Sequence, residues 1–452
     1  MYTQEIGRKF LNLFNEKTGK ELSALEFFEE EFFPVLFDSE DHLQLMQVTN
    51  SSFFQKISKK DRTDKIRDSV IKKDRFLNDV EEVSKGKKTI SGAVAVGFMA
   101  GDIDKGTSGQ ISSIDFDLSE ENILFSWFGG ALGIGFGGGY DFLFENDELL
   151  WFVYQGWKFY RKFLNETSKA KGRQIETWNG LWVCYGLQNK NNLDQAYSEV
   201  LDQINENHGI QGGLIKLNRP KWSEQVFSIA RFLSDENLKE LIYGYSFGQM
   251  NKTLGFLHLD LGSVKYMPDI FEQLIDQDPE LKRSQIKKLE EVYRTQFSLE
   301  KAATLGGIGV KSLKPKDLYK YTAGDVRDNA KKAPKLDKEE KRLTFITYLT
   351  WIQAMLNNED TLKLSEEVAE ALIQFEGKEN RLRTRIKQVE GLWESRNRQQ
   401  LIDGLTAILD EDASSAETIN KTVEQLMTSI PQDMFKLFLT LVKFKYHYYQ
   451  SN

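Results

Sequence analysis

Aspartates are the residues of this sequence with the clearest potential for metal chemistry. Asp115 and Asp117 are one residue apart, so on a strand both carboxylates point to one face, and Asp141 follows a glycine-rich segment. Restriction-type nucleases combine such carboxylates with a Glu or Gln and a Lys around Mg²⁺, because the metal activates water and stabilises developing charge. Gln155 and Lys158 are the nearest such partners, but two residues separate them where the motif has one. A metal-dependent nuclease is therefore an alternative function, and a metal site at the three aspartates is left open.

A second candidate is the run GIGFGG at 133–138, which has the glycine spacing of a dinucleotide-binding loop. Such a loop requires a preceding strand, a following helix and an acidic residue about 20 positions further on. Here the residues after Tyr140 alternate like a strand, and position 158 is a lysine. We therefore predict no dinucleotide site and no cofactor, and expect these glycines to allow close packing or a bend in β-structure.

The segment from Ile123 to Tyr140 contains no charged residue over 18 positions, the minimum length for a membrane-spanning helix. Seven of its residues are glycines, each costing a helix about 1 kcal/mol relative to alanine. We therefore expect buried or edge β-structure without stable membrane insertion, and a membrane-acting protein is a minor alternative. The amino terminus lacks the basic and apolar regions of a secretory signal, so a cytoplasmic location is expected.

Other catalytic signatures are missing from the sequence. The four histidines are too widely spaced for a zinc motif, and Cys184, the single cysteine, cannot form an internal disulfide. No serine-hydrolase, P-loop or kinase motif occurs. We therefore predict no catalytic residue and no metal ligand, and leave open whether the protein is an enzyme.

The charge of the chain limits how it can bind nucleic acid. Lys and Arg number 60 and Asp and Glu 68, which gives a net charge of −8. This charge excludes a protein that coats nucleic acid uniformly, but not one with a local basic groove. Three stretches are locally basic: 56–75, 305–316 and 381–398.

Each basic stretch has a functional and a structural interpretation. The stretch 305–316 resembles the hairpin of helix-hairpin-helix modules, in which small residues expose backbone N–H groups to a phosphate. The structural alternatives are a solvated mixed-charge face, a helix C-cap with a loop, and long side-chain stems at a bundle seam. The candidate nucleic-acid-binding residues are Lys59, Lys60, Arg62, Gly307, Gly309, Lys311, Lys314, Lys316, Arg381 and Arg385.

The spacing of apolar residues divides the chain into three parts. Residues 1–85 have helical spacing, 86–336 form an α+β body, and 337–452 repeat at the spacing of a helical bundle. Short polar connections predict antiparallel hairpins in the body. The predicted class is α+β, with an antiparallel β-rich middle, flanking helices and a carboxy-terminal antiparallel bundle. In the body we expect strands at 93–96, 111–118, 123–128, 131–144 and 180–185, a helix over 148–163, and mainly helices over 192–241.

This layout resembles the large subunit of type I CRISPR interference complexes, which join an α+β amino-terminal part to a helical bundle. The resemblance implies a protein that holds a guide RNA–target duplex and reads a flanking DNA motif through Gly-rich loops and Lys or Arg. We therefore expect a non-catalytic nucleic-acid-binding subunit of a prokaryotic antiviral assembly. Its expected partners are nucleic acid and the other protein subunits of that complex.

Overall fold

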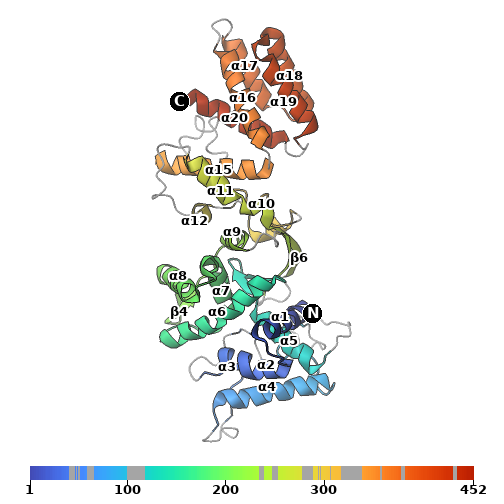
Figure 1. The fold of residues 1–452 in the computed structure, drawn as a ribbon, viewed down its shortest axis with the longest axis vertical. Helices are drawn as coiled ribbons and strands as arrows, with labels where there is room; N and C mark the ends of the chain where they lie inside the picture. The colour runs from blue at the N-terminus through green and yellow to red at the C-terminus, as the bar shows by residue number, and fades with distance from the viewer. Residues whose placement is uncertain are drawn as a thin grey trace. The chain divides into compact units, whose positions relative to one another are not determined.

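Two compact units make up the chain in the computed structural model (Figure 1). Unit 1 contains Met1–Gly262 and Ser298–Gly309, and unit 2 contains Ser263–Phe297 and Val310–Asn452. The chain therefore passes between the units three times. The structure describes residues 1–39, 46, 48, 51–58, 66–98, 118–233, 239–246, 253–276, 289–293, 295, 297–305, 307–316, 338–356, 359–377, 382–430 and 435–451.

Unit 1 is mainly helical, and polar caps fix several of its helix starts. Side chains of Ser23, Ser119, Asn146 and Asn192 accept hydrogen bonds from backbone N–H groups of the helices that follow them. The helices of unit 1 are α1 (Tyr2–Thr18), α2 (Ala24–Phe27), η1 (Phe28–Phe32), α3 (Phe33–Leu36), α4 (Asp68–Ser84), α5 (Glu120–Ala131), α6 (Asp147–Glu166), α7 (Ile175–Leu181), η3 (Trp182–Gly186), η4 (Leu187–Asn189), α8 (Leu193–Glu206), α9 (Trp222–Phe232) and α13 (Leu299–Ala303).

Two glycines explain why the predicted strand at 123–128 is wrong and α5 forms instead. A Cβ on Gly7 of α1 would lie 1.9 Å from the Phe125 carbonyl oxygen, and one on Gly129 would lie 1.9 Å from the Thr3 carbonyl oxygen. The helix backbones therefore touch, and this packing outweighs the low helix propensity of glycine.

Among the described residues, no helix combines the length and hydropathy needed to cross a membrane.

Aromatic side chains fill the interior beside this helix pair. Phe27 packs edge-on against Phe14 and Phe128, with ring centroids 4.9 and 4.8 Å apart. Phe32 contacts Trp157 of α6 at 5.7 Å. These rings are almost fully buried, and such pairs add about 0.5–1.5 kcal/mol each beyond the area they bury.

A four-stranded antiparallel sheet lies in unit 1, in the order β1-β2-β5-β6. Its strands are β1 (Ile134–Phe136), β2 (Tyr140–Leu143), β5 (Lys239–Tyr245) and β6 (Thr253–Asp260). Gly138 and Gly139, at φ of 104° and 83°, form the β1–β2 turn, which confirms β-structure within 131–144. A separate hairpin joins β3 (His208–Gln211) to β4 (Leu214–Leu217) through Gly212 and Gly213, which also have positive φ.

Other predicted elements of the body agree only in part. The expected helix over 148–163 is confirmed as α6. The expected helices of 192–241 are present as α8 and α9, but β3, β4 and the start of β5, which were not predicted, also lie in this range. The strand expected at 180–185 is wrong, because α7 and η3 occupy it, and 93–96 forms turns. Short apolar runs do not distinguish a buried strand from a buried helix, which accounts for both errors. The strand expected at 111–118 lies almost entirely outside the described residues.

Unit 2 is helical, as the apolar repeats predict, and the α+β class is confirmed for the whole chain. Its last helices pack side by side around one apolar core, with α16 against both α17 and α20. The helix α10 begins at the boundary between the two units. The helices of unit 2, together with α10 at its boundary, are α10 (Leu261–Lys265), α11 (Met267–Asp276), α12 (Leu289–Val292), α15 (Lys338–Leu356), α16 (Glu359–Glu376), α17 (Leu382–Trp393), α18 (Arg398–Glu411), η8 (Ala413–Ser415), α19 (Ala416–Thr428) and α20 (Phe435–Ser451).

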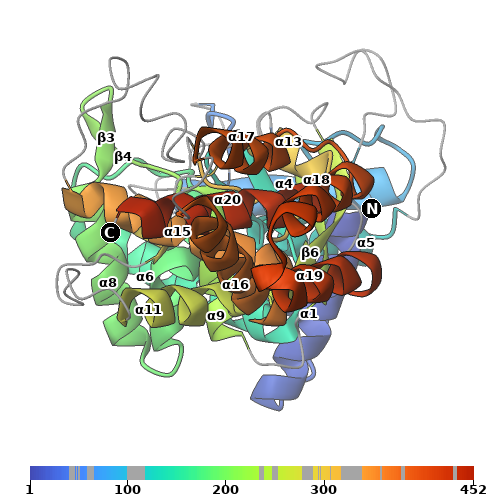
Figure 2. The same ribbon diagram turned by 90° about the horizontal axis from the view of Figure 1, so that it is seen from above.

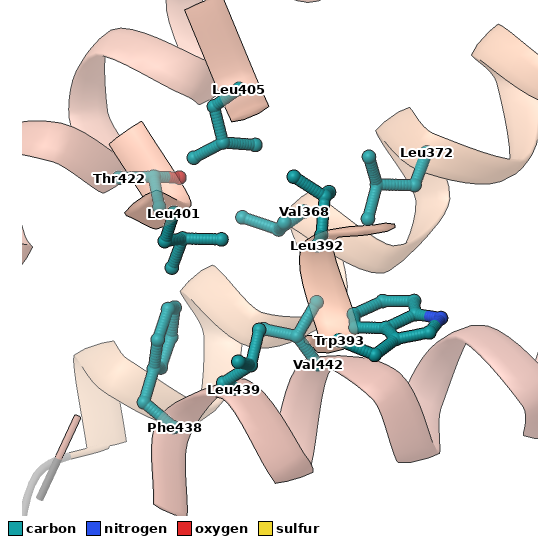
Figure 3. Close-up of a pocket in the computed structure, with 10 residues that line it drawn as sticks. All are labelled: Val368, Leu372, Leu392, Trp393, Leu401, Leu405, Thr422, Phe438, Leu439 and Val442. Atoms are coloured by element: carbon teal, nitrogen blue, oxygen red, sulfur yellow. The ribbon is translucent and has the colours of Figure 1, made fainter. Parts of the chain in front are cut away.

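A small apolar cavity lies inside this bundle, between side chains from α16 to α20 (Figure 3). Its volume is about 10 Å³, and Thr422 is the single polar residue among those that line it. A buried water needs polar partners and at least this much space, so the cavity is expected to be dry. It is a packing defect of the core rather than a ligand site.

Candidate nucleic-acid interface

Four of the ten predicted binding residues, Lys59, Lys60, Arg62 and Arg381, lie outside the described residues. The other six divide between two regions, the loop before α15 and helix α17 of the bundle.

The glycines of the predicted phosphate-binding loop pack against the edge of the sheet. Ile308 N–H donates to the His258 carbonyl at 2.7 Å, and Asp260 N–H donates to the Ile308 carbonyl at 2.8 Å. A Cβ on Gly307 would lie 3.0 Å from the His258 carbonyl oxygen, and one on Gly309 would lie 3.2 Å from Asp260 Cβ. The close approach of this loop to β6 therefore explains why residues 307 and 309 are glycines, without any role in phosphate binding.

The three lysines after this loop lie on a segment held by α15. Trp351 Nε1 donates to the Val310 carbonyl at 2.6 Å. Lys314 Nζ lies 5.6 Å from the centre of the Trp351 ring, a cation–π distance, and is partly exposed. Lys311 and Lys316 are exposed. These cations belong to unit 2 and remain candidates for phosphate contact.

Arg385 has a different environment inside the bundle. Its Nε donates to Glu411 Oε1 at 3.0 Å, its Nη1 donates to the Phe375 carbonyl at 3.1 Å, and it is only 8% exposed. The guanidinium also lies 4.9 Å from the centre of the Phe375 ring. These contacts join α16, α17 and α18, so the structure supports the packing interpretation of this residue.

One cationic feature among the described residues was not predicted. Residues 169–171 add a strand-like segment to β4, next to the β3–β4 hairpin seen in Figure 2. Lys171 N–H donates to the Ile215 carbonyl at 2.9 Å, and Ile215 N–H donates to the Lys169 carbonyl at 2.7 Å. Ala170 pairs with Ile215 as a parallel bridge. The result is a single parallel bridge beside the two-stranded β3–β4 sheet.

Alternation along the ladder brings three lysines to one face. Because Ala170 and Ile215 share a face, strand alternation predicts that their neighbours Lys169, Lys171 and Lys216 point to the other. We call these three residues the lysine ladder. Lys169 and Lys216 are exposed, Lys171 is partly exposed, and none has an ion pair with another described residue. Lys171 Nζ donates to Gln211 Oε1 at 2.7 Å, which places Gln211 of β3 on the same face.

The side chain of Gln174 joins the segment 169–171 to β4. Its side-chain N–H donates to the Lys171 carbonyl at 2.7 Å, and its Oε1 accepts from Leu217 N–H at 3.1 Å. Gln174 is buried and also contacts the hydroxyl of Tyr160 through its backbone N–H, at 3.1 Å. One amide side chain therefore bridges the added segment and β4.

Arg173 follows the lysine ladder in a strained conformation. Its φ of 63° makes it the single non-glycine residue with positive φ among the described residues. The guanidinium lies 3.8 Å from the centre of the Phe54 ring, and burial lowers the pKa of Arg173 from its ordinary value. Backbone strain of this kind costs about 1–2 kcal/mol and is concentrated at functional sites.

Asp141, one of the three aspartates at which a metal site was left open, lies in the core of unit 1. Asp141 is fully buried on β2 and forms an ion pair with Arg219, whose Nη1 lies 3.1 Å from Asp141 Oδ1. Arg219 also donates to the Tyr140 carbonyl at 2.9 Å and to Thr177 Oγ1 at 3.3 Å. In the part of the chain that the structure describes, no three His, Cys, Asp or Glu residues are grouped to hold a metal. Asp115 and Asp117 lie outside it.

The lysine ladder carries a sequence signal that is easy to overlook. Lys169-Ala170-Lys171 alternates with period two, and Lys216 stands 45 positions later between the apolar residues Ile215 and Leu217. Residues 158–173 contain six Lys or Arg and one acidic residue, Glu166, so part of this signal is a basic stretch, whereas only strand pairing joins Lys216 to it. Comparison of the chain with protein families, with curated proteins and with solved structures gives no match.

Proposed function

We propose that the protein binds nucleic acid through the lysine ladder, as a non-catalytic subunit of a prokaryotic nucleic-acid-targeting assembly. The observation that carries this proposal is the gathering of Lys169, Lys171 and Lys216 on one open face of a chain whose net charge is −8. Phosphate contacts dominate nucleic-acid affinity, and lysines are common partners of phosphate.

The dimensions of the ladder suit a phosphate backbone. Side chains two residues apart on a strand start about 6.6 Å apart, and adjacent strands are about 4.8 Å apart. The three ammonium groups can therefore reach neighbouring phosphates of one strand. Gln211 and the exposed hairpin beside them add polar and apolar surface, and two-stranded β-ribbons are known readers of nucleic-acid grooves.

Further lysines support the proposal in unit 2. Lys311, Lys314 and Lys316 belong to one short segment that Trp351 anchors to α15. Their spacing supplies a second local concentration of positive charge. The assignment to an antiviral assembly, with other protein subunits and a cytoplasmic location, rests on the layout of an α+β body followed by a helical bundle.

The test is the salt dependence of binding. Fluorescence anisotropy with labelled DNA duplex, single-stranded DNA, RNA and RNA–DNA heteroduplex is measured between 50 and 200 mM salt. The slope of log K against log salt changes by about 0.9 for each duplex phosphate contact, so by about 2.7 if all three lysines bind. The variant Lys169→Ala/Lys171→Ala/Lys216→Ala should lose this part of the slope and bind more weakly.

The matched control removes three exposed lysines elsewhere, as Lys301→Ala/Lys363→Ala/Lys436→Ala. Both variants change the net charge equally, so a loss confined to the first identifies the lysine ladder. Equal slopes and affinities for the two variants would contradict the proposal. Parallel reactions with Mg²⁺ or EDTA show whether the nucleic acid is cut, and metal-dependent cleavage would favour the nuclease alternative.

A further inference from the structure

A second surface of unit 1 has the opposite charge. A groove of about 420 Å³ lies between α2, α4 and the start of α5. Figure 1 shows these three helices close together. Its floor is apolar and its rim is acidic. The floor residues are Leu25, Leu77, Val80 and Leu124, and the rim residues are Asp74, Glu81, Glu120 and Glu121, with Ser23 and Asn78 between them.

The floor remains partly open to solvent although it is built from leucines. Leu25 is 45% exposed, and Leu77 is partly exposed, whereas Val80 and Leu124 belong to the buried core. Asp74, Leu77, Asn78 and Glu81 recur at the i, i+3, i+4, i+7 spacing of one helix face. That stripe of α4 is about 10.5 Å long, the length of two helical turns.

The rim carries more carboxylates than it has basic side chains paired with them. Lys85 forms an ion pair with Glu81, and this contact lowers the pKa of Glu81 below its ordinary value. Ser84 Oγ donates to Glu120 at 3.3 Å. Asp74 and Glu121 form no ion pair with any residue that the structure describes. Four carboxylates therefore face the groove with a single paired lysine.

We propose that this groove docks a basic amphipathic helix of a partner protein. Two turns of such a helix match the length of the stripe on α4, and its apolar side chains would cover Leu25 and Leu77. Lysine or arginine side chains on its flanks would meet the acidic rim, which gives both attraction and orientation. Residues 101–117, which precede α5 in the sequence, contain four aspartates and one lysine. This segment therefore lacks the positive charge that would complement the acidic rim. This inference does not depend on nucleic-acid binding.

The experiment uses the full chain and a designed helical peptide of about 18 residues as the probe. The peptide has leucines at i, i+3, i+4 and i+7 with flanking lysines, and a control peptide has glutamates in place of the lysines. Fluorescence anisotropy should show that the basic peptide binds and the acidic control peptide does not. Salt should weaken this binding, because exposed charges are screened. The variant Asp74→Lys/Glu121→Lys should bind it at least about tenfold more weakly, since attraction becomes repulsion at two positions.

Two further variants separate docking from loss of structure or general charge. Glu370→Lys/Glu417→Lys makes the same charge change on exposed bundle positions and should bind like the unchanged protein. Leu25→Ser should weaken binding while leaving its salt dependence unchanged. Binding of the acidic peptide, or equal affinity of the two charge-reversed variants, overturns the proposal. Self-association abolished by Asp74→Lys/Glu121→Lys would also overturn it, by assigning the groove to a second copy of the chain.

Discussion

The ion pair between Asp141 and Arg219 leads to a quantitative prediction for stability. Asp141 is 0% exposed, and the Arg219 side chain is 25% exposed and 3.1 Å away. Removing one member of a buried pair costs about 3–5 kcal/mol, because the remaining charge stays desolvated. Total stabilities are about 5–15 kcal/mol, so this loss is a large fraction of the whole.

The two members of the pair should not be equivalent. Arg219→Met leaves a carboxylate in the interior and removes donors to Tyr140 and Thr177, so we expect a cost of about 3–4 kcal/mol. Asp141→Asn leaves a guanidinium that still reaches water, and we expect a cost of about 1–2 kcal/mol. The double variant should cost at least about 1.5 kcal/mol less than the two single costs added together.

Urea unfolding monitored by tryptophan fluorescence measures these costs. Trp127, Trp157, Trp178 and Trp182 are fully buried in unit 1, so their emission reports the unfolding of this unit. The tryptophans of unit 2 report the unfolding of that unit, and the urea midpoint of its transition should not change in these variants. Additive costs within about 0.5 kcal/mol, or a cost below about 1 kcal/mol for Arg219→Met, would refute the reasoning.

Three further predictions concern backbone geometry and the lysine ladder. Gly129→Ala should cost more than about 3 kcal/mol in urea unfolding, because its Cβ meets a backbone carbonyl at 1.9 Å; Gly391→Ala on α17, with open space around it, should stabilise by about 0.5–1 kcal/mol. Arg173→Gly should leave the free energy of unfolding within about 1 kcal/mol, since relief of the positive φ offsets the lost contact with Phe54, but should weaken nucleic-acid binding in anisotropy titrations. Gln174→Ala should weaken the same binding without changing charge, and hydrogen exchange of the Ile215 amide should speed up. Unchanged exchange and binding would show that Gln174 does not hold the ladder.

Sequence reasoning succeeded where the apolar period was long and failed where it was short. Leu364, Val368 and Leu372 repeat over several turns, and they form one buried face of α16. The run from Ile123 to Phe128 is apolar except for Ser126, so it has no period to separate a strand from a helix. Its outcome was decided by Gly7, more than a hundred residues earlier, because that glycine lets α1 touch α5.

The candidate site shows a related limit of local reasoning. Gly307 and Gly309 match a phosphate-loop pattern, yet their contacts with His258 and Asp260 depend on β6, which no local pattern connects with them. The lysine ladder is assembled by pairing between residues 169–171 and β4, which are distant in sequence. Charge runs identify cations that are neighbours along the chain, whereas strand pairing brings together cations that are neighbours in space.

The repeated passage of the chain between units 1 and 2 has a consequence for synthesis on the ribosome. The outer edge of β6 gains its partner, Ile308, only when residues up to Gly309 have emerged. At the usual speed of translation this takes about 2–9 s after Gly262 has been added. During that interval β6 has an unpaired edge, which is the kind of surface that aggregates with other chains. The nascent protein is therefore most vulnerable late in the synthesis of unit 1, and expression at low temperature or with a chaperone that covers strand edges should raise its soluble yield.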